Sequence, residues 1–355
     1  KGAARDKSIV IFVLFFFVVL FWMAFEQAGN ALNLWAEFFT QRKLVFFDME
    51  AEAYQSINAI GIVILGPVFA WLWLRLARSG REPSTPLKMA IAMVFVALSF
   101  VAMVGAAVFE AQGESRVHIA KAAIPSSIDI SKLNAGRLTY DDAKEELVVK
   151  GVLASYVVND ALTRAAAPEY RASVEAFVTA TESGTAPFTG KLEKVPADTD
   201  PSKIDPKLNP KWENGALTVS DKIDASNKTK LLGLGAPREW REALTSLSEK
   251  SDNSRVTGFW LFLSYMLATI GELCLSPVGL SMVTKLAPAR FASLFMGVWM
   301  LASSVAQYAG GSIGESWGTI TPSVYFNLFV LSSAIGAVIL FVLVHPLKRL
   351  MHNVN

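Results

Sequence analysis

Long apolar runs that carry almost no charge alternate with short polar connections along most of the chain. A bilayer core is ~30 Å thick, so a transmembrane helix needs about 20 such residues in a row. Six runs reach that length, at about 8–39, 55–77, 88–111, 256–284, 291–314 and 322–346. The pattern predicts an all-α membrane protein, a bundle of six transmembrane helices.

A polar insert, about 113–254, separates the third predicted span from the fourth. Its first part, about 139–182, is rich in Ala, Glu and Leu and predicts helix, broken near Pro168. The next stretch is crowded with Pro, Lys and Asp and predicts an irregular arm, after which WREALTSLSEK predicts a short helix. Cys274 is the only cysteine, so no disulfide within one chain holds the insert. We expect a mostly helical insert.

Lys and Arg are concentrated in the short flanks on one side of the predicted bundle. Short cytoplasmic loops carry such an excess, whereas long loops are translocated regardless of charge. That side holds Lys1, Arg5, Lys7, Arg75, Arg78, Arg81, Lys88, Lys285, Arg290, Lys348 and Arg349, and the other side holds Arg42, Lys43 and Arg255. Both termini are therefore expected in the cytoplasm and the insert outside it. The net charge of +2 gives no reason to propose nucleic-acid binding.

Two carboxylates, Glu26 and Glu272, lie inside segments that are otherwise suited to lipid. A carboxylate at membrane depth costs at least ~2.5–3.5 kcal/mol and is normally found facing a bundle interior or a wet cavity. A purely structural pair remains an alternative. By default, however, both residues are functional candidates.

Helical spacing places further polar residues beside these carboxylates. Residues three or four apart share a helix face. The resulting stripes are Trp22, Glu26, Asn30, Asn33 and Glu37 on the first span, Gln55 and Asn58 on the second, Tyr265, Thr269, Glu272, Ser276 and Gly279 on the fourth, and Trp299, Ser303 and Gln307 on the fifth. The third and sixth spans carry little comparable. We expect four helices to line a cavity while these two face lipid.

Simpler interpretations apply to several of these residues. Asn or Ser in a membrane helix often only forms a hydrogen bond to a neighbouring helix. For Asn30 and Ser276 this explanation is as good as a role in substrate binding. Trp22 and Trp299 are also explained by packing. The sequence GESWG at 314–318 matches a nucleophile motif but lacks its strand-turn-helix setting and a His partner. No pattern predicts catalysis, a cofactor or a metal site, because the three histidines are unpaired in sequence.

Three segments resemble a known family. They are similar to helices of the proton-dependent oligopeptide transporters (POT/PTR family) of the major facilitator superfamily. The seventh helix resembles FWMAFEQAGNALNLWA and the eighth resembles YQSINAIGIVILGPVFAWLW. The tenth and eleventh helices together resemble GELCLSPVGLSMVTKLAPARFASLFMGVWMLASSVAQYAGG. The resemblance implies that 1–112 holds helices 7–9, that 255–355 holds helices 10–12, and that 113–254 is an external loop. The chain, which begins at Lys1 rather than Met, then lacks the N-terminal six-helix half.

The resemblance also implies roles for single residues. Glu26 resembles the seventh-helix carboxylate that takes up a proton, and Glu272 the tenth-helix carboxylate that holds the peptide ammonium, assisted by Asn58. Trp22, Asn30, Ser276 and Trp299 resemble parts of the substrate pocket. The family usually has Ser where this chain has Asn30, and Pro where it has Ala59, which bears on substrate range.

The expected function is therefore proton-coupled symport of di- and tripeptides across a bacterial inner membrane, with the insert in the periplasm. The partners implied are peptides, protons, lipid and the N-terminal half. One alternative is a family member that carries nitrate or a peptide-like compound. Another is a six-helix membrane scaffold that presents the insert to a protein partner, although such a scaffold has no need of Glu26 and Glu272.

Overall fold

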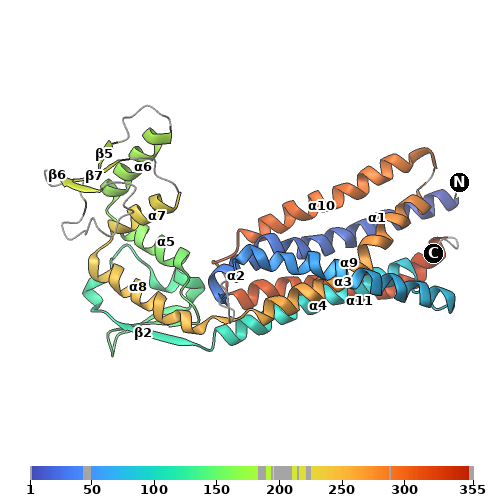
Figure 1. Cartoon of the computed structure of the whole chain (residues 1–355), viewed down its shortest axis with the longest axis horizontal. Helices are drawn as coiled ribbons and strands as arrows, with labels where there is room; N and C mark the ends of the chain where they lie inside the picture. The colour runs from blue at the N-terminus through green and yellow to red at the C-terminus, as the bar shows by residue number, and fades with distance from the viewer. Residues whose placement is uncertain are drawn as a thin grey trace. The chain divides into compact units, whose positions relative to one another are not determined.

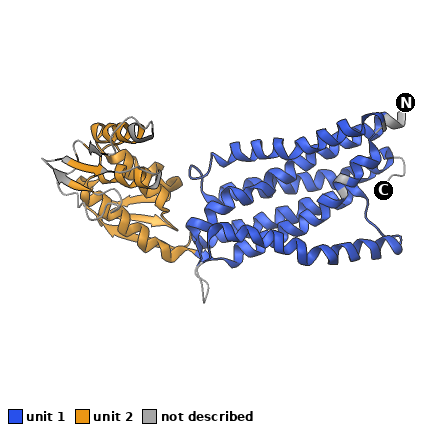
Figure 2. Cartoon of the chain, turned by 45° about the horizontal axis from the view of Figure 1, so that its top comes forward, with its two compact units in different colours: residues 1–110, 256–355 blue, residues 111–255 orange. Residues whose placement is uncertain are grey.

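The computed structural model describes residues 2–42, 49–182, 189–192, 195, 210–213, 216–220, 225–287 and 289–351. The chain divides into two compact units, which Figure 2 colours separately. Unit 1 comprises residues 1–110 and 256–355, and unit 2 comprises residues 111–255. Unit 2 is thus inserted in the sequence of unit 1.

Unit 1 is built from long helices (Figure 1). Its elements are α1 (Gly2–Phe25), the 3-10 helix η1 (Glu26–Gly29), α2 (Ala31–Phe39), β1 (Thr40–Gln41), η2 (Ala51–Gln55), α3 (Ser56–Arg78), α4 (Thr85–Glu110), β8 (Val256–Thr257), α9 (Phe259–Leu286), η8 (Ala289–Phe291), α10 (Ala292–Gly314) and α11 (Pro322–Leu350). The short strands β1 and β8 pair in parallel.

Five stretches of unit 1 are long and apolar enough to cross a membrane. They are Arg5–Phe39, Ala51–Arg78, Thr85–Glu110, Phe259–Leu286 and Pro322–Leu350. These five confirm five of the six predicted spans. The sixth predicted span, 291–314, forms helix α10, which is long enough but less apolar because it carries Ser303, Ser304 and Gln307.

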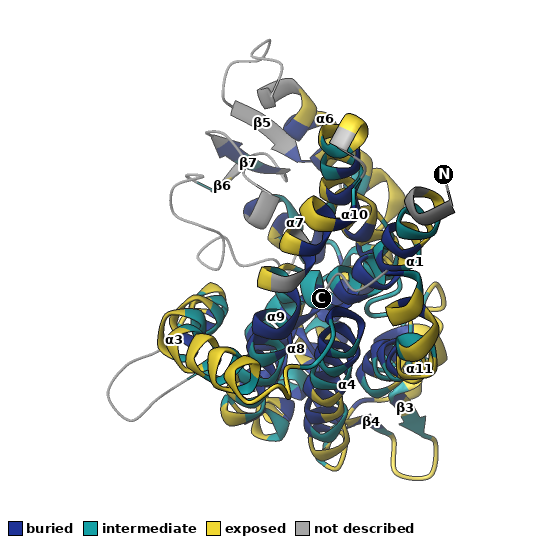
Figure 3. Ribbon diagram, turned by 90° about the vertical axis from the view of Figure 1, so that its right-hand side faces the viewer, coloured by how far each residue is buried: buried dark blue, intermediate teal, exposed yellow. Residues whose placement is uncertain are grey.

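Helix α4 lies at the centre of unit 1, packed against both α9 and α11. In its most apolar stretch 56% of the residues are buried, compared with 6% for α3, which is largely exposed in Figure 3. Phe100 of α4 stacks on Phe329 of α11 with ring centroids 5.0 Å apart. The prediction that the third and sixth spans face lipid is therefore wrong for the third, and the sixth, α11, buries one face in the bundle. Apolar residues on all faces of a helix are compatible with packing against neighbouring helices as well as with lipid.

Unit 2 combines helices and strands. Its elements are β2 (Glu114–His118), η3 (Lys121–Ala123), η4 (Ile130–Gly136), β3 (Leu138–Asp141), β4 (Glu146–Lys150), α5 (Ser155–Ala165), α6 (Pro168–Glu182), β5 (Thr189–Leu192), β6 (Lys211–Glu213), β7 (Ala216–Ser220), α7 (Ala225–Leu234), α8 (Arg238–Ser251) and η7 (Asp252–Ser254). The strands form two three-stranded antiparallel sheets, with orders β2-β4-β3 and β5-β7-β6.

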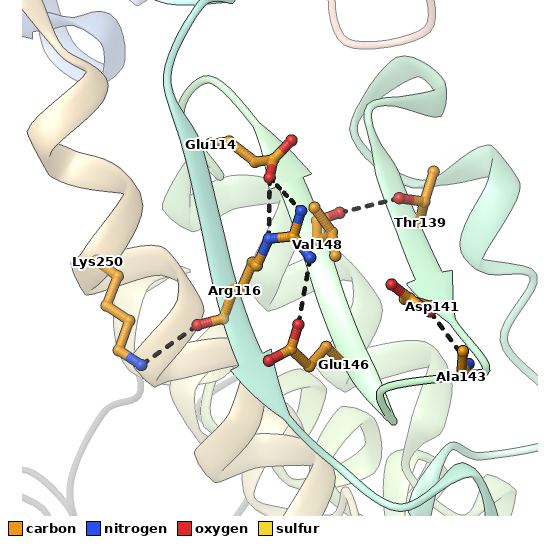
Figure 4. A network of polar contacts seen from close by, with 8 residues as sticks. All are labelled: Glu114, Arg116, Thr139, Asp141, Ala143, Glu146, Val148 and Lys250. Carbon is orange, nitrogen blue, oxygen red and sulfur yellow. Dashed lines mark hydrogen bonds and ion pairs between the residues drawn. The ribbon is translucent and has the colours of Figure 1, made fainter.

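Polar contacts join the first sheet of unit 2 to helix α8 (Figure 4). The guanidinium of Arg116 on β2 contacts the carboxylates of Glu114 and Glu146 at 2.6 and 3.3 Å, and Glu146 lies on β4. The Lys250 ammonium of α8 donates a hydrogen bond to the backbone oxygen of Arg116 at 3.2 Å. These contacts are exposed, so each contributes little to stability.

The helical prediction for the insert is confirmed only in part. Helix α8 covers the predicted last helix, and α5 and α6 are separated just before Pro168 as expected. The prediction is wrong for 139–150, where β3 and β4 pair in the sheet. Leu147, Val148 and Val149 suit a strand once neighbouring strands are present, because β propensity depends strongly on context. The predicted Pro-rich arm lies mostly outside the described residues, and its described ends form β5 and β6.

Candidate functional site

A cavity of about 230 Å³ lies inside unit 1, between the first span, α3, α4 and α9. It is lined by Ala24, Phe25, Glu26, Ala28, Gly29, Leu32, Gln55, Asn58, Val96, Ser99, Phe100, Tyr265 and Ala268. The first, second and fourth predicted spans line this cavity, as the polar stripes predict, but no described residue of the fifth span, α10, is among its lining. Helix α4 also lines it, which the sequence analysis did not anticipate.

The first span is interrupted where it meets this cavity. Helix α1 ends at Phe25, η1 follows, and the chain reaches α2 through Asn30, whose φ of −121° and ψ of −101° are not helical. Such a break leaves backbone groups without helix partners, and membrane proteins accept this only where other groups satisfy them. The Tyr265 hydroxyl of α9 supplies one such contact, a 3.3 Å hydrogen bond to the backbone oxygen of Ala28.

The clearest polar contact of the site joins α3 to α9. The side-chain amide nitrogen of Asn58 donates to a carboxylate oxygen of Glu272 at 3.0 Å and to the Thr269 hydroxyl oxygen at 3.0 Å. The Thr269 hydroxyl in turn donates to the backbone oxygen of Tyr265 at 2.7 Å. Both bonds use the amide nitrogen of Asn58, so its carbonyl oxygen takes no part in them. The arrangement holds one oxygen of the Glu272 carboxylate against the Asn58 amide.

Glu26 occupies the first position of the break and lines the cavity. Its carboxylate accepts a hydrogen bond of 3.4 Å from the side-chain amide of Gln307 on α10, which is long and solvent-exposed. The structure therefore brings together three of the predicted site residues, because Asn58 both lines the cavity with Glu26 and bonds Glu272.

The other four predicted site residues are not among the described residues that line this cavity. The Trp22 ring packs edge-on against Phe25 at 5.2 Å, and the Asn30 side chain contacts Gly314 of α10. Trp299 is buried against Gly279, where a Cβ would come within 2.5 Å of the indole.

Ser276 lies on α9, where its hydroxyl is buried without a hydrogen-bond partner among the described residues. These placements agree with packing roles for the two tryptophans. They leave pocket roles for all four as predictions.

Sequence reasoning missed Ser99, Phe100 and Gln27. Ser99 is fully buried on α4, and its hydroxyl donates to the backbone oxygen of Val96 at 2.8 Å. It is a rare polar residue in that long apolar run, and this was the available signal. Gln27 follows Glu26 directly but lies off the polar stripe, so helical spacing gave it no role.

Comparison with known proteins identifies the family. A sequence profile of the POT family matches residues 1–151 and 234–323, which is more than half of the chain. The chain belongs to the POT family. Residues 152–233, which separate the two matched stretches, all lie within unit 2.

Several bacterial transporters are similar to this chain. YclF of Bacillus subtilis, called an uncharacterized transporter, is 24% identical over 341 residues, 96% of this chain and 40% of that protein. The peptide transporter YePEPT of Yersinia enterocolitica is 24% identical over 352 residues, 98% of this chain and 42% of that protein. A di-/tripeptide transporter of Lactococcus lactis is 35% identical over 103 residues, 29% of this chain and 21% of that protein.

The fold agrees with these relatives. A crystal structure of a peptide transporter POT in complex with sulfate superposes with a TM-score of 0.55 at 20% identity, over 99% of this chain and 42% of that one. This chain thus spans about two fifths of the length of the proteins that it matches over nearly its whole extent.

The family predicted from the residues is confirmed, and with it a multi-pass membrane protein of a transporter family rather than an enzyme. The assignment to the C-terminal half of such a transporter stays a prediction.

Proposed function

We propose that this chain is the C-terminal, six-helix half of a proton-coupled symporter of di- and tripeptides, with α10 as its sixth transmembrane helix. Membership in the POT family supports transport, and similarity to a peptide transporter and a di-/tripeptide transporter supports the substrate class. Transporters of this kind bind their substrate at midplane between two halves that rock against each other. The proposal includes an N-terminal half that completes the cavity.

The observation that carries the proposal is the Asn58–Glu272 contact beside a cavity that Glu26 also lines. A charged carboxylate that the Asn58 amide holds in place suits a peptide ammonium, because charge-assisted hydrogen bonds are about twice as strong as neutral ones. Such a contact recognises a group that all these peptides share and is independent of their side chains. We assign this role to Glu272 and Asn58.

We assign to the Glu26 carboxylate the binding of the proton that is transported with the peptide. A carboxylate in a largely apolar cavity, at a break in a transmembrane helix, is where proton relays in transporters are found. Among the described residues its carboxylate accepts one hydrogen bond, the long contact with Gln307, so protonation breaks no strong interaction. In the complete transporter we place Trp22, Asn30, Ser276 and Trp299 in the pocket wall.

We further propose an inner-membrane location, with both termini in the cytoplasm and unit 2 in the periplasm. The excess of Lys and Arg on one side of the bundle supports this orientation.

The test compares Glu26→Gln with Glu272→Gln in the full-length transporter in proteoliposomes. Glu26→Gln should abolish uptake driven by a pH gradient but keep peptide exchange, which needs no net proton movement. Glu272→Gln should weaken binding and depress both. Losing one charge-assisted bond is worth about 1.5–3 kcal/mol, which corresponds to about ten- to a hundredfold in affinity.

Glu37→Gln provides the matched control. Glu37 lies on the same span, but its carboxylate pairs with Arg42 at 2.8 Å and is 42% exposed, outside the cavity. It should transport like wild type in both assays. Identical behaviour of the Glu26 and Glu272 variants would contradict the division of roles, and absence of peptide uptake by the wild type would contradict the proposed function itself.

A further inference from the structure

Gln27 forms a buried hydrogen-bond network immediately beside the proposed proton site. Its side-chain oxygen accepts a 2.6 Å hydrogen bond from the Tyr325 hydroxyl of α11. Its amide nitrogen donates to the backbone oxygens of Met23 at 3.2 Å and Gly310 at 3.3 Å. Gln27 is 1% exposed and Tyr325 is fully buried. A buried amide is costly unless it is bonded, and here both of its ends are bonded.

The network joins three elements at the break in the first span. Met23 lies in the last turn of α1, where a helix leaves backbone oxygens without helical partners, and the Gln27 amide bonds one of them. Gly310 belongs to α10 and Tyr325 to α11. Consecutive residues of a 3-10 helix project about 120° apart. Gln27 therefore projects into the packing of α10 and α11, while Glu26 lines the cavity.

The approach of α10 to the break depends on glycine. A Cβ at position 310 would lie 3.0 Å from the Gln27 amide nitrogen and 3.2 Å from the Met23 oxygen, closer than ordinary van der Waals contact. A Cβ at position 314, one turn later, would clash with the Asn30 side chain. The small residues thus let α10 lie directly against η1 and its following residue.

We propose that Gln27 and Tyr325 are a pair of positioning residues that hold the break and thereby keep Glu26 turned into the cavity. This inference rests on the proposed function, in which Glu26 carries the proton. Gln307 of α10 bonds Glu26, Tyr265 of α9 lines the same cavity, and the Glu272 carboxylate is bonded to Asn58 of that lining. Without the pair, η1 rotates or joins α1, and Glu26 loses this environment.

The first measurement reports the position of the break without requiring transport. A Cys at position 29 fits, because a Cβ there meets no atom within 4 Å, and position 29 lines the cavity. Cys274 is 1% exposed and gives little background in a full-length transporter without other cysteines. The rate of labelling of Gly29→Cys by a water-soluble maleimide should fall about two- to tenfold in Gln27→Leu and in Tyr325→Phe.

The second measurement is the pH profile of peptide uptake in proteoliposomes. The pH of half-maximal uptake should shift by about 0.3 to 1 unit in both variants, which matches a two- to tenfold change in proton affinity. The matched control is Thr40→Val, since the Thr40 hydroxyl is equally buried and bonds the Trp35 backbone oxygen at the far end of α2. It should alter neither measurement.

The double variant Gln27→Leu with Tyr325→Phe separates positioning from stability. It leaves neither side chain with a buried, unpaired polar group, so folding should recover relative to the single variants. The labelling rate of Gly29→Cys and the pH of half-maximal uptake should nevertheless remain shifted from their wild-type values. If both return to wild type in the double variant, or never change in the single ones, the positioning role is wrong. If the wild type shows no uptake, the proposed function fails, while the labelling rates still decide whether the pair holds the break.

Discussion

Units 1 and 2 differ in which side chains they expose. All strongly exposed large hydrophobic side chains among the described residues belong to unit 1, with Val63 at 75% and Val342 at 71%. Its interior, in contrast, holds Gln27 and Thr269 in hydrogen bonds. Unit 2 has the reverse arrangement, with ion pairs at the surface and a core of apolar residues around Tyr170.

This difference changes what a polar residue indicates in each unit. In unit 2 a charged side chain is usually explained by water. In unit 1 the outer face suits lipid, so a polar group inside must serve packing, binding or proton transfer. The contrast explains why the sequence of unit 1 pointed to particular residues, whereas that of unit 2 did not.

The largest effect should come from placing the same charge on the outer face of each unit. Val338→Arg, near the middle of α11 and 63% exposed, should destabilise the membrane-inserted protein by about 2.5–3.5 kcal/mol. Thr245→Arg on the exposed face of α8 should change stability by less than about 0.5 kcal/mol. Unfolding of both variants in detergent and in lipid measures the difference. Equal effects in lipid would show that the outer face of α11 does not contact the bilayer core.

A smaller effect is expected from a polar group inside unit 2. The Tyr170 hydroxyl donates a 2.6 Å hydrogen bond to the Leu231 backbone oxygen. Tyr170→Phe leaves that oxygen unpaired and should cost about 1–3 kcal/mol of the unfolding free energy of unit 2. Calorimetry measures the loss. Tyr140→Phe is the control, because its hydroxyl makes a similar bond to Ile119 in a half-buried setting and should matter less.

The same residue predicts a pH dependence. Burial raises the pKa of the Tyr170 phenol above its ordinary value, with the charge of Arg241 opposing this more weakly. Its contribution to stability is therefore present below about pH 10 and is lost as the pH rises toward the raised value. The unfolding temperature of wild-type unit 2 should fall more steeply between about pH 10 and 12 than that of Tyr170→Phe. Parallel curves would contradict the raised pKa.

The smallest effect on transport should follow removal of most of unit 2. Gly113 and Ser254, near its two ends, are in close contact, so a short Gly/Ser linker can replace 115–252. Because the proposed binding groups all lie in unit 1, proton-coupled peptide uptake should stay within about threefold of wild type, less than one decade of affinity. Uptake by proteoliposomes with matched protein content measures it. Complete loss with normal insertion would assign unit 2 a part in substrate capture or gating.

The sequence predicted the spans well because length and apolar composition alone decide whether a segment can cross a membrane. It placed Glu26, Asn58 and Glu272 on facing stripes because helical periodicity is a local property. It failed for 139–150, where strand formation depends on β2, a distant partner. It also failed for α4, since an apolar helix carries no signal that separates contact with lipid from contact with other helices.

Composition and periodicity were enough to predict the class of protein, the transmembrane segments and the few polar residues that could act inside them. Packing between helices is needed to explain why the first span breaks at Glu26–Asn30, why Asn58 bonds Glu272, and why Gln27 bonds Tyr325 across 298 positions of sequence. Local pattern fixes which side chains a helix can present on each face. Which of them meet depends on how helices far apart in sequence pack, and that is settled by the shapes of their contacting surfaces.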